Sequence, residues 1–234
     1  MIKAVVFDLD GTIVDFNLDY KAVRAEVIRF LTQQGLPSSI LSLNESIFEM
    51  LKKGEICMRN NGKGEREIAR VREAVLSLAD RYELEAAHTT SLLPGVIETL
   101  KALREMKLKT ALFTINSEKS TGYILECFRL KSFFDAIITR ESVSAVKPDP
   151  AHLEAALRAL NVKAEEAMVV GDGVGDMKCA RGLDVIAVGV TTGLSSPEEL
   201  TRAGATYLIS SFTDLITLVR RLNKLRTSRS VDKP

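Results

Sequence analysis

The order of apolar and polar positions divides the chain into short buried strands and amphipathic helices. Apolar runs without polar alternation recur along the chain, at residues 4–7, 109–114, 136–139, 167–171, 185–189 and 207–209. Such runs are typical of strands that are covered on both faces, as in parallel sheets. Between the later runs apolar residues recur at helical spacing, as in Leu153, Leu157 and Leu160. Strands that alternate with helices in this way predict an α/β fold with a doubly wound parallel sheet.

The segment between the first strand and residue 92 departs from this alternation. Its apolar residues have the spacing of three helices, with Val23, Val27, Phe30 and Leu31 in the first, Ile40, Leu43, Ile47 and Leu51 in the second, and Ile68, Val71, Val75, Leu78 and Tyr82 in the third. The Gly- and Asn-rich stretch 52–64 is predicted to connect the second helix to the third. Because a loop between a strand and a helix usually has ~2–6 residues, the segment predicts an inserted helical domain.

These patterns predict the domain boundaries. We expect a core of residues 1–13 and 92–224, an inserted helical domain of residues 14–91, and a flexible polar tail of residues 225–234. A domain inserted directly after the first strand would lie over the end of that strand as a lid.

Composition narrows the class of protein. The hydrophobic fraction of 46% and the charged fraction of 27% are ordinary for a globular protein. The net charge of +1 provides no general attraction for nucleic acid or an anionic membrane, and no apolar run reaches the length of a membrane span. The chain starts without a signal-peptide pattern, and its three cysteines are scattered. We therefore expect a cytoplasmic protein without a nucleic-acid or membrane partner; the sequence does not indicate its oligomeric state.

Two carboxylates follow the first strand. Asp8 and Asp10 are two residues apart, so on an extended chain they point to the same side. Two like charges that close repel by about 4 kcal/mol at a surface-like dielectric constant, which favours a bound cation or a retained proton. The chain has no Cys or His cluster with zinc spacing, so oxygen ligands and Mg²⁺ are the natural expectation. The alternative is a solvated turn in which Gly11 supplies the unusual backbone angles.

Other polar side chains follow later strands of the predicted sheet. Thr114 and Asn116 come after the second strand, and Asp172 and Asp176 after the fourth. Lys147 precedes a helix that leads into the fourth strand. Because ligands of open α/β sheets bind beyond the carboxyl ends of the strands, these groups are predicted to converge. Each also has a structural alternative, as a strand threonine, a solvated lysine or an acidic helix cap.

Taken in order, these segments resemble a known set of motifs. The stretch Asp8–Thr12, then Thr114, Lys147–Pro148 and residues 171–176 resemble the four motifs of the haloacid dehalogenase superfamily of phosphotransferases. The resemblance covers residues 2–222, and the inserted helices match the subgroup with a helical cap on a Rossmann-like core. Residues 189–200 further resemble the phosphoglycolate-phosphatase-like branch. The resemblance implies a Mg²⁺-dependent phosphatase whose partner is a small phosphorylated metabolite, such as 2-phosphoglycolate.

The resemblance also implies roles for the carboxylates. Asp8 would be the nucleophile that forms an aspartyl-phosphate. Asp10 would be the general acid for the leaving alkoxide and then the base for the hydrolytic water. The metal would be bound by the carboxylates of Asp8 and Asp172 and by the backbone carbonyl of Asp10. Asp176 would act through water or by orienting its neighbours.

The remaining roles concern the phosphoryl group and the substrate. Thr114 would hydrogen-bond the phosphoryl oxygens, and Lys147 would neutralise charge on them and on Asp8. Further substrate contacts are expected from Gly11, Thr12, Ile115 and Asn116 in the core and from Lys53 and Arg59 in the cap. Relatives commonly have Asn or a small residue where this chain has Ile115, so only its backbone N–H can serve. The alternative for Lys53 and Arg59 is that they form part of a solvated basic surface and do not contact the substrate.

Two other functions fit parts of this pattern. A β-phosphoglucomutase-like sugar-phosphate mutase would use the same motifs, with a cap that excludes water and lets the product rebind. A non-catalytic phosphate-binding module would keep Asp8, Thr114 and Lys147 but would not need Asp10 or the cap.

Overall fold

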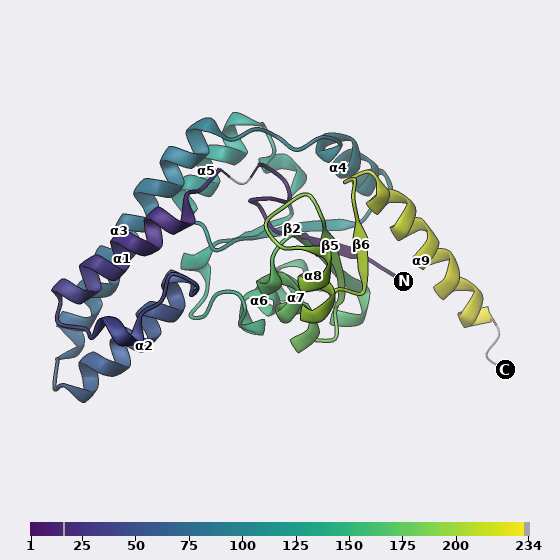
Figure 1. The fold of residues 1–234 in the computed structure, drawn as a ribbon. Helices are drawn as coiled ribbons and strands as arrows, with labels where there is room; N and C mark the ends of the chain where they lie inside the picture. The colour runs from purple at the N-terminus through teal and green to yellow at the C-terminus, as the bar shows by residue number, and fades with distance from the viewer. Residues whose placement is uncertain (16, 232–234) are drawn as a thin grey trace. The chain divides into compact units, whose positions relative to one another are not determined.

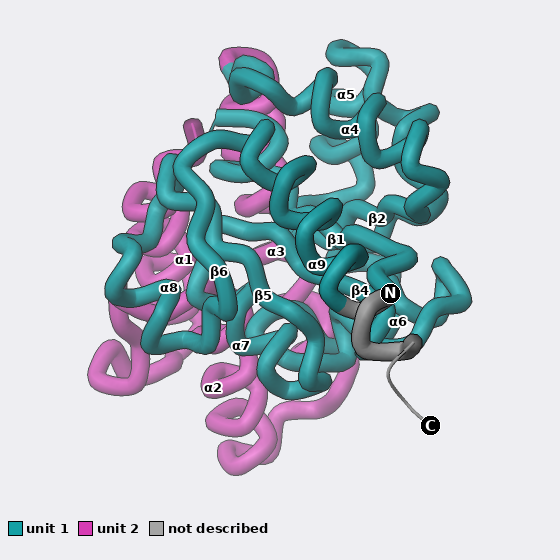
Figure 2. The backbone as a smooth tube through the Cα atoms, turned by 90° about the vertical axis from the view of Figure 1, so that its right-hand side faces the viewer, with its two compact units in different colours: residues 1–16, 90–234 teal, residues 17–89 magenta. Residues whose placement is uncertain are grey.

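The chain folds into two compact units. The computed structural model describes residues 1–15 and 17–231, with side chains described up to residue 225. Unit 1 comprises residues 1–16 and 90–234, and unit 2 comprises residues 17–89 (Figure 2). The ends of unit 2 therefore lie within three residues of the expected insertion, 14–91.

Unit 1 is built on a parallel sheet. Among the described residues the sheet has six strands, β1 (Ala4–Phe7), β2 (Lys109–Phe113), β3 (Ala136–Ile138), β4 (Ala167–Gly171), β5 (Ile186–Val190) and β6 (Tyr207–Ile209). Their order is β3-β2-β1-β4-β5-β6, and every neighbouring pair is parallel. The predicted doubly wound α/β fold is confirmed.

Helices cover both faces of this sheet (Figure 1). On one side lie α6 (Pro150–Leu160), α7 (Val174–Gly182) and α8 (Pro197–Ala203), and on the other α4 (Val96–Glu105) and α9 (Asp214–Val231). The helix α5 (Glu118–Cys127) joins β2 to β3, and short 3₁₀ turns occupy residues 131–133, 140–142 and 164–166. The side chains of β1 pack against the helical layers on both faces of the sheet. Val6 is in the same buried cluster as Leu153 of α6, whereas Phe7 stacks on Phe212, with ring centroids 5.6 Å apart.

Unit 2 consists of α1 (Tyr20–Gln33), α2 (Ile47–Asn60) and α3 (Glu65–Thr89), with a 3₁₀ turn at residues 38–40. Its core contains Val27, Leu31, Met50 and Val75. Three helices were predicted here, but the prediction for the second helix was wrong at both ends. It starts at Ile47, because Ser46 and Glu49 form a reciprocal capping box.

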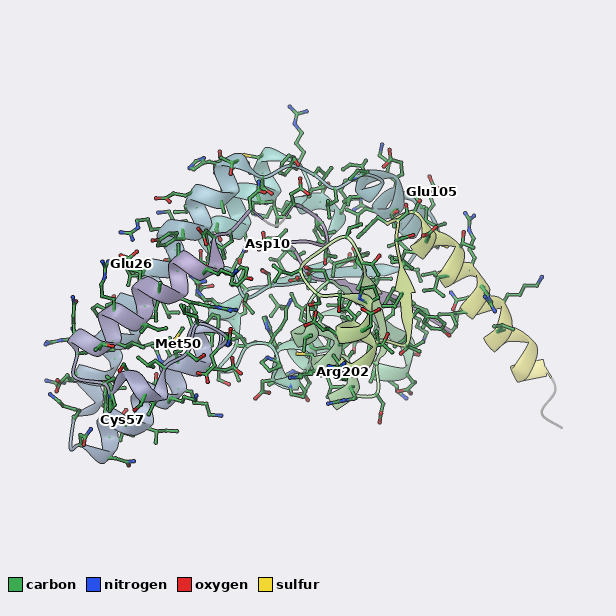
Figure 3. All side chains as sticks on the ribbon, in the orientation of Figure 1. Asp10, Glu26, Met50, Cys57, Glu105 and Arg202 are labelled. Atoms are coloured by element: carbon green, nitrogen blue, oxygen red, sulfur yellow. The ribbon has the colours of Figure 1, made fainter. Side chains whose placement is uncertain are left out.

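The second helix also extends through most of the predicted connection. Residues 52–60 are helical, so Lys53 and Arg59 lie on α2 (Figure 3 labels Met50 and Cys57 of this helix). Gly54 is buried in the middle of α2, and a Cβ atom there would be 2.7 Å from Leu36 Cδ2. This glycine therefore serves close packing and not a turn.

The last helix extends into the predicted tail. Residues 225–231 continue α9, and residues 232–234 lie outside the described chain, so the expected flexible tail of residues 225–234 stays a prediction. The segment contains no Gly and no Pro before Pro234, so nothing in its sequence ends the helix. In the described part of the chain we find no helix with the length and apolar character that crossing a membrane requires.

The strand order brings the acidic motifs together. β1 and β4 are neighbours, with Phe7 opposite Val170, and the Asp8 N–H donates to Val170 O at 2.9 Å. Asp8 and Asp172 thus follow adjacent strands at the same edge. From β1 the chain adds β2 and β3 on one side of the sheet and then β4, β5 and β6 on the other. Ligands of open α/β sheets usually bind at the point between β1 and β4 where this order changes side.

Candidate active site

The turn after β1 presents the first two aspartates. The carbonyl oxygen of Leu9 accepts hydrogen bonds from the N–H groups of Thr12, Ile13 and Val14, which closes the turn directly behind the strand. Figure 3 shows Asp10 on this turn. Gly11 has φ +74°, and a Cβ atom there would lie 2.3 Å from Asp172 Oδ2. Glycine is thus required both by the backbone angle and by the approach of Asp172.

Three carboxylates form a tight group at this edge. One oxygen from each of Asp8, Asp172 and Asp176 lies within 4.8 Å of the others. Asp172 and Asp176 are buried, and Asp8 has a side-chain exposure of 13%. Asp10 is not part of this group, so its expected role as a metal ligand would rest on its backbone carbonyl.

Lys147 is the cation of the group. Its Nζ atom lies 2.5 Å from Asp8 Oδ1 and 2.7 Å from Asp176 Oδ1, and its side chain is only 7% exposed. Burial alone would lower the pKa of Lys147, but the nearby carboxylates of Asp176 and Asp8 outweigh it and raise the pKa above its ordinary value. The lysine is therefore charged at neutral pH.

The carboxyl groups lack sufficient compensating charge. Burial, together with the charges of Asp8 and Asp176, raises the pKa of Asp172 from 3.8 to about 8. Burial also raises the pKa of Asp176, to about 6, although Lys147 acts in the opposite direction. A divalent cation would relieve both shifts. Hard oxygen ligands with a span of a few ångströms suit Mg²⁺, whose ligands lie at ~2.1 Å.

Hydrogen bonds and glycines fix the orientation of these carboxylates. Asp172 Oδ2 accepts from the Leu194 N–H at 2.8 Å, and Asp176 Oδ2 accepts from the Gly173 N–H at 3.0 Å. The Thr12 hydroxyl faces Asp172 Oδ1 at 3.5 Å. At Gly193 a Cβ atom would lie 2.1 Å from Asp172 Oδ2. The carboxylate of Asp172 therefore leaves no room for a side chain at position 11 or 193.

The second motif supports the other aspartate. Thr114 is buried, and its hydroxyl accepts from the Asn116 N–H at 3.1 Å. The Asn116 side-chain Nδ2 donates to Asp10 Oδ2 at 2.6 Å. Ile115, between them, is 38% exposed. The amide of Asn116 is thus bonded to Asp10, and its expected contact with the substrate stays a prediction.

Two residues near Lys147 were not found from the sequence. The fully buried His152 accepts the Lys147 backbone N–H on Nδ1 at 3.2 Å. The ring of Phe113 contacts both residues, with its centroid 4.0 Å from Lys147 Nζ and 5.5 Å from the centroid of the His152 ring. Burial, and the charge of Lys147, lower the pKa of His152 to about 3, so this imidazole is neutral. The sequence offered one indication of this pair, since His152 follows Lys147 by five residues and lies on the buried face of a predicted helix.

The predicted cap residues already have partners within unit 2. Lys53 Nζ lies 2.5 Å from Glu45 Oε1, and Arg59 Nε lies 2.7 Å from Glu65 Oε1. All four side chains are at least a quarter exposed, and exposed pairs of this kind are worth only about 0–1 kcal/mol. Both cations thus take part in exposed ion pairs, and their expected contact with a substrate stays a prediction.

A separate cavity of about 830 Å³ lies elsewhere in unit 1. Its walls come mainly from α5 and the segment 129–142, and they contain none of the predicted site residues. The assignment of the active site therefore depends on the convergence of charged groups at the sheet edge and not on the size of a cavity.

Together, these groups can perform a specific kind of chemistry. A carboxylate that is salt-bridged to a buried lysine, beside two further carboxylates able to hold a divalent cation, is suited to attack an electrophile that carries negative charge. Asp10, outside the carboxylate group, has a separate hydrogen-bonded environment suited to proton transfer.

Comparison with known proteins agrees with this geometry. A family model described as haloacid dehalogenase-like hydrolase matches residues 2–184. The pyrophosphatase PpaX of Listeria innocua is 29% identical over 226 residues, which cover 94% of this chain and 97% of that protein. The phosphoglycolate phosphatase of Pseudomonas putida is 29% identical over 220 residues, or 92% and 78% of the two chains. A solved hydrolase from Pseudomonas syringae superposes with a TM-score of 0.65 at 25% identity, covering 94% of this chain and 98% of that structure.

Proposed function

The chain belongs to the haloacid dehalogenase-like hydrolases, and from this premise we propose that it is a Mg²⁺-dependent phosphatase of small phosphate monoesters that uses Asp8 as its nucleophile. The observation that carries the proposal is the placement of Asp8. Its carboxylate is paired with the buried Lys147 and lies within 4.8 Å of the oxygens of Asp172 and Asp176.

The first half of the reaction forms a phosphoenzyme. A carboxylate oxygen of Asp8 attacks phosphorus, and the bond between phosphorus and the ester oxygen breaks. Asp10 donates a proton to the departing alkoxide, which leaves as the alcohol. The positive charge of Lys147 and the Thr114 hydroxyl stabilise the negative charge on the phosphoryl oxygens.

The second half releases phosphate. Asp10, now deprotonated, accepts a proton from water as the water oxygen attacks phosphorus. The bond between phosphorus and Asp8 breaks, and the carboxylate is regenerated. Mg²⁺ held by Asp8, Asp172 and the Asp10 carbonyl would supply positive charge to the phosphoryl group in both halves. Asp176, bonded to Lys147 and Gly173, holds the lysine in place.

The substrate is proposed from the relatives and the cap. One relative is named for phosphoglycolate and another for pyrophosphate, both small anions with a terminal phosphoryl group. We favour a small phosphate monoester similar to 2-phosphoglycolate. Lys53 and Arg59 are the cap candidates for binding the rest of the substrate, each in exchange for its present glutamate.

The test is phosphate release from p-nitrophenyl phosphate with and without Mg²⁺. We expect metal-dependent turnover in the wild type and none in Asp8→Asn. The matched control is Asp184→Asn, because Asp184 is exposed in the turn after α7 and its left-handed φ of 54° suits asparagine. Turnover that persists in Asp8→Asn would refute the nucleophile.

A panel of phosphorylated metabolites then separates the substrate hypotheses. A phosphatase of monoesters releases inorganic phosphate from 2-phosphoglycolate or a related acid. Pyrophosphate cleaved faster than every monoester would overturn the preference for monoesters. A sugar phosphate isomerised without release of phosphate would instead indicate the mutase.

A further inference from the structure

We propose that Arg140 and Asn116 are positioning residues for the proton transfer by Asp10, with Arg140 fixing the loop that carries Asn116 and Asn116 fixing the carboxyl group. The inference rests on the proposed function, because it takes Asp10 as the general acid. Arg140 belongs to none of the sequence motifs, so the sequence did not indicate a role for it.

The loop between β2 and α5 is tied to the turn that follows β3. Arg140 Nη1 donates to Ile115 O at 3.1 Å, and the Arg140 backbone N–H donates to Asn116 O at 3.3 Å. Glu141 Oε2 accepts from the Glu118 N–H at 3.0 Å. Two consecutive residues of the 3₁₀ turn thus hold three of the four positions 115–118.

Burial shows that this tie is not an ordinary surface contact. The side chain of Arg140 is 3% exposed, although a guanidinium is among the groups that are most costly to remove from water. Its Nε lies 3.3 Å from Glu141 Oε1, and this ion pair offsets part of that cost. A neutral residue could pack in this place without that cost. The charged donor that reaches the Ile115 carbonyl therefore indicates a requirement for rigidity at the loop.

The loop transmits this rigidity to Asp10. Asn116 is 5% exposed, and its backbone N–H is held by the Thr114 hydroxyl at 3.1 Å. With both of its backbone polar groups bonded, Asn116 projects its amide from a fixed base. The amide Nδ2 donates to Asp10 Oδ2 at 2.6 Å. A donor on one carboxyl oxygen sets the plane in which the group can meet a leaving oxygen.

A general acid depends on such orientation. Proton transfer contributes typically ~10²–10⁴-fold to the rate, and a displacement of about 1 Å can cost ~10²-fold. Loss of the Asn116 amide should therefore remove part of the contribution of Asp10 and leave the nucleophilic attack by Asp8 intact.

Two esters distinguish these steps. Nitrophenolate is a stable anion that leaves without a proton, whereas the alkoxide of glycerol 2-phosphate needs one. The parameter kcat/KM includes only the steps up to formation of the phosphoenzyme, so it excludes the later use of Asp10 as a base. We would measure kcat/KM with Mg²⁺ for both esters in the wild type, Asn116→Leu, Arg140→Met and Arg140→Lys, with Asp10→Asn as the reference. Asn60→Leu is the matched control, because Asn60 is exposed at the end of α2 in unit 2.

Asn116→Leu is expected to lower kcat/KM for glycerol 2-phosphate by about 10-fold or more beyond any loss that it causes for p-nitrophenyl phosphate. Arg140→Met should lower the ratio of kcat/KM for glycerol 2-phosphate to that for p-nitrophenyl phosphate, as Asp10→Asn does. Arg140→Lys should restore part of this ratio. Asn60→Leu should leave the ratio unchanged.

Equal losses on both esters, or no loss on either, would overturn the inference, because a merely structural role does not select the leaving group. If Asn116→Leu does not fold, Asn116→Ser repeats the test with a hydroxyl that is too short to reach Asp10. A wild-type enzyme inactive on both esters would overturn the phosphatase proposal and this inference with it, a result distinct from an active enzyme with an unchanged ratio.

Discussion

The stability of the metal-free protein should fall as the pH rises from 5 to 8, and Mg²⁺ should restore it. The pKa of Asp172 is raised to about 8 and that of Asp176 to about 6, in both cases mainly by burial. A carboxyl group with a higher pKa in the folded than in the unfolded protein binds more protons when folded. The free energy of unfolding is therefore highest near or below the ordinary value of 3.8 and decreases until the pH passes the folded value.

The size of the effect follows from these values. Each pH unit between the unfolded and the folded pKa of Asp172 costs up to about 1.4 kcal/mol. His152 acts in the opposite direction up to about pH 6.5, because its pKa is lowered from 6.5 to about 3 in the folded protein. Relaxation around the ionised carboxyl group reduces the limit further, so we expect a net loss on the order of 2–3 kcal/mol between pH 5 and pH 8, most of it above pH 6.5. For a protein of this size, 1 kcal/mol changes the Tm by roughly 2–4 °C. The Tm of the metal-free protein should thus fall by about 5–10 °C.

Magnesium acts in the opposite direction. At 100 times its Kd a ligand that binds only the folded state stabilises it by about 2.7 kcal/mol. Because the cation must replace the proton on Asp172, its effect should be large at pH 8 and small at pH 5. The increase in Tm on addition of Mg²⁺ should therefore grow with pH.

The assay is thermal unfolding at several pH values, with EDTA or with excess Mg²⁺. Asp172→Asn should flatten the pH dependence of the metal-free protein and remove most of the stabilisation by Mg²⁺, whereas Asp184→Asn should retain both. A shift with Mg²⁺ that is the same at pH 5 and pH 8, or that persists in Asp172→Asn, would refute the reasoning.

Three further predictions test the supports of the site. Gly11→Ala should lower stability more than Gly62→Ala by about 1–3 kcal/mol in denaturant titrations, because both glycines have positive φ but only the Cβ at position 11 would meet Asp172; equal losses would contradict the close approach. Lys147→Met should reduce kcat by about 10²-fold or more with p-nitrophenyl phosphate, and a smaller change than tenfold would remove the lysine from phosphoryl stabilisation. His152→Leu should lower kcat while His152→Asn, which can still accept the Lys147 N–H, retains more of it; identical kinetics in both variants would show that His152 only fills space.

The strands and the core motifs were the predictable part of this protein. β1 and β4 are buried on both faces, and their uniform apolar sequences carry that information locally. The motif residues follow strands whose order in the sheet obeys general rules of α/β folds, so the convergence of Asp8 with Asp172 could be anticipated.

The errors in the second helix had two sources, a glycine that serves a tertiary contact and a local capping signal that periodicity obscured. Gly54 suggested a break, but it lies within α2, where Leu36 leaves no room for a side chain. Ile40 and Leu43 continued the helical spacing of Ile47, yet the capping box at Ser46 starts the helix later. A capping box is readable from sequence, and a serine three residues before Glu49 was the signal that periodicity obscured.

The supports of the site were the least predictable part. The partners of Asn116 and Lys147 come from positions 10 and 152, and Arg140 acts on a loop 25 residues earlier in the chain. No local pattern specifies such pairs. The position of Asn116 after the second strand did not indicate its hydrogen bond to Asp10.

The charges of the site explain why so much of the structure serves to hold it. Three carboxyl groups within 4.8 Å share one buried lysine, so the side chains alone are short of positive charge before any phosphate enters. A phosphate dianion would be repelled unless a divalent cation had entered first, which requires the carboxylates to be oriented in advance. The glycines that meet Asp172 and the backbone donors from Gly173 and Leu194 provide that orientation at a cost in stability. Metal affinity and stability of the metal-free fold should therefore vary in opposite directions among variants of these carboxylates.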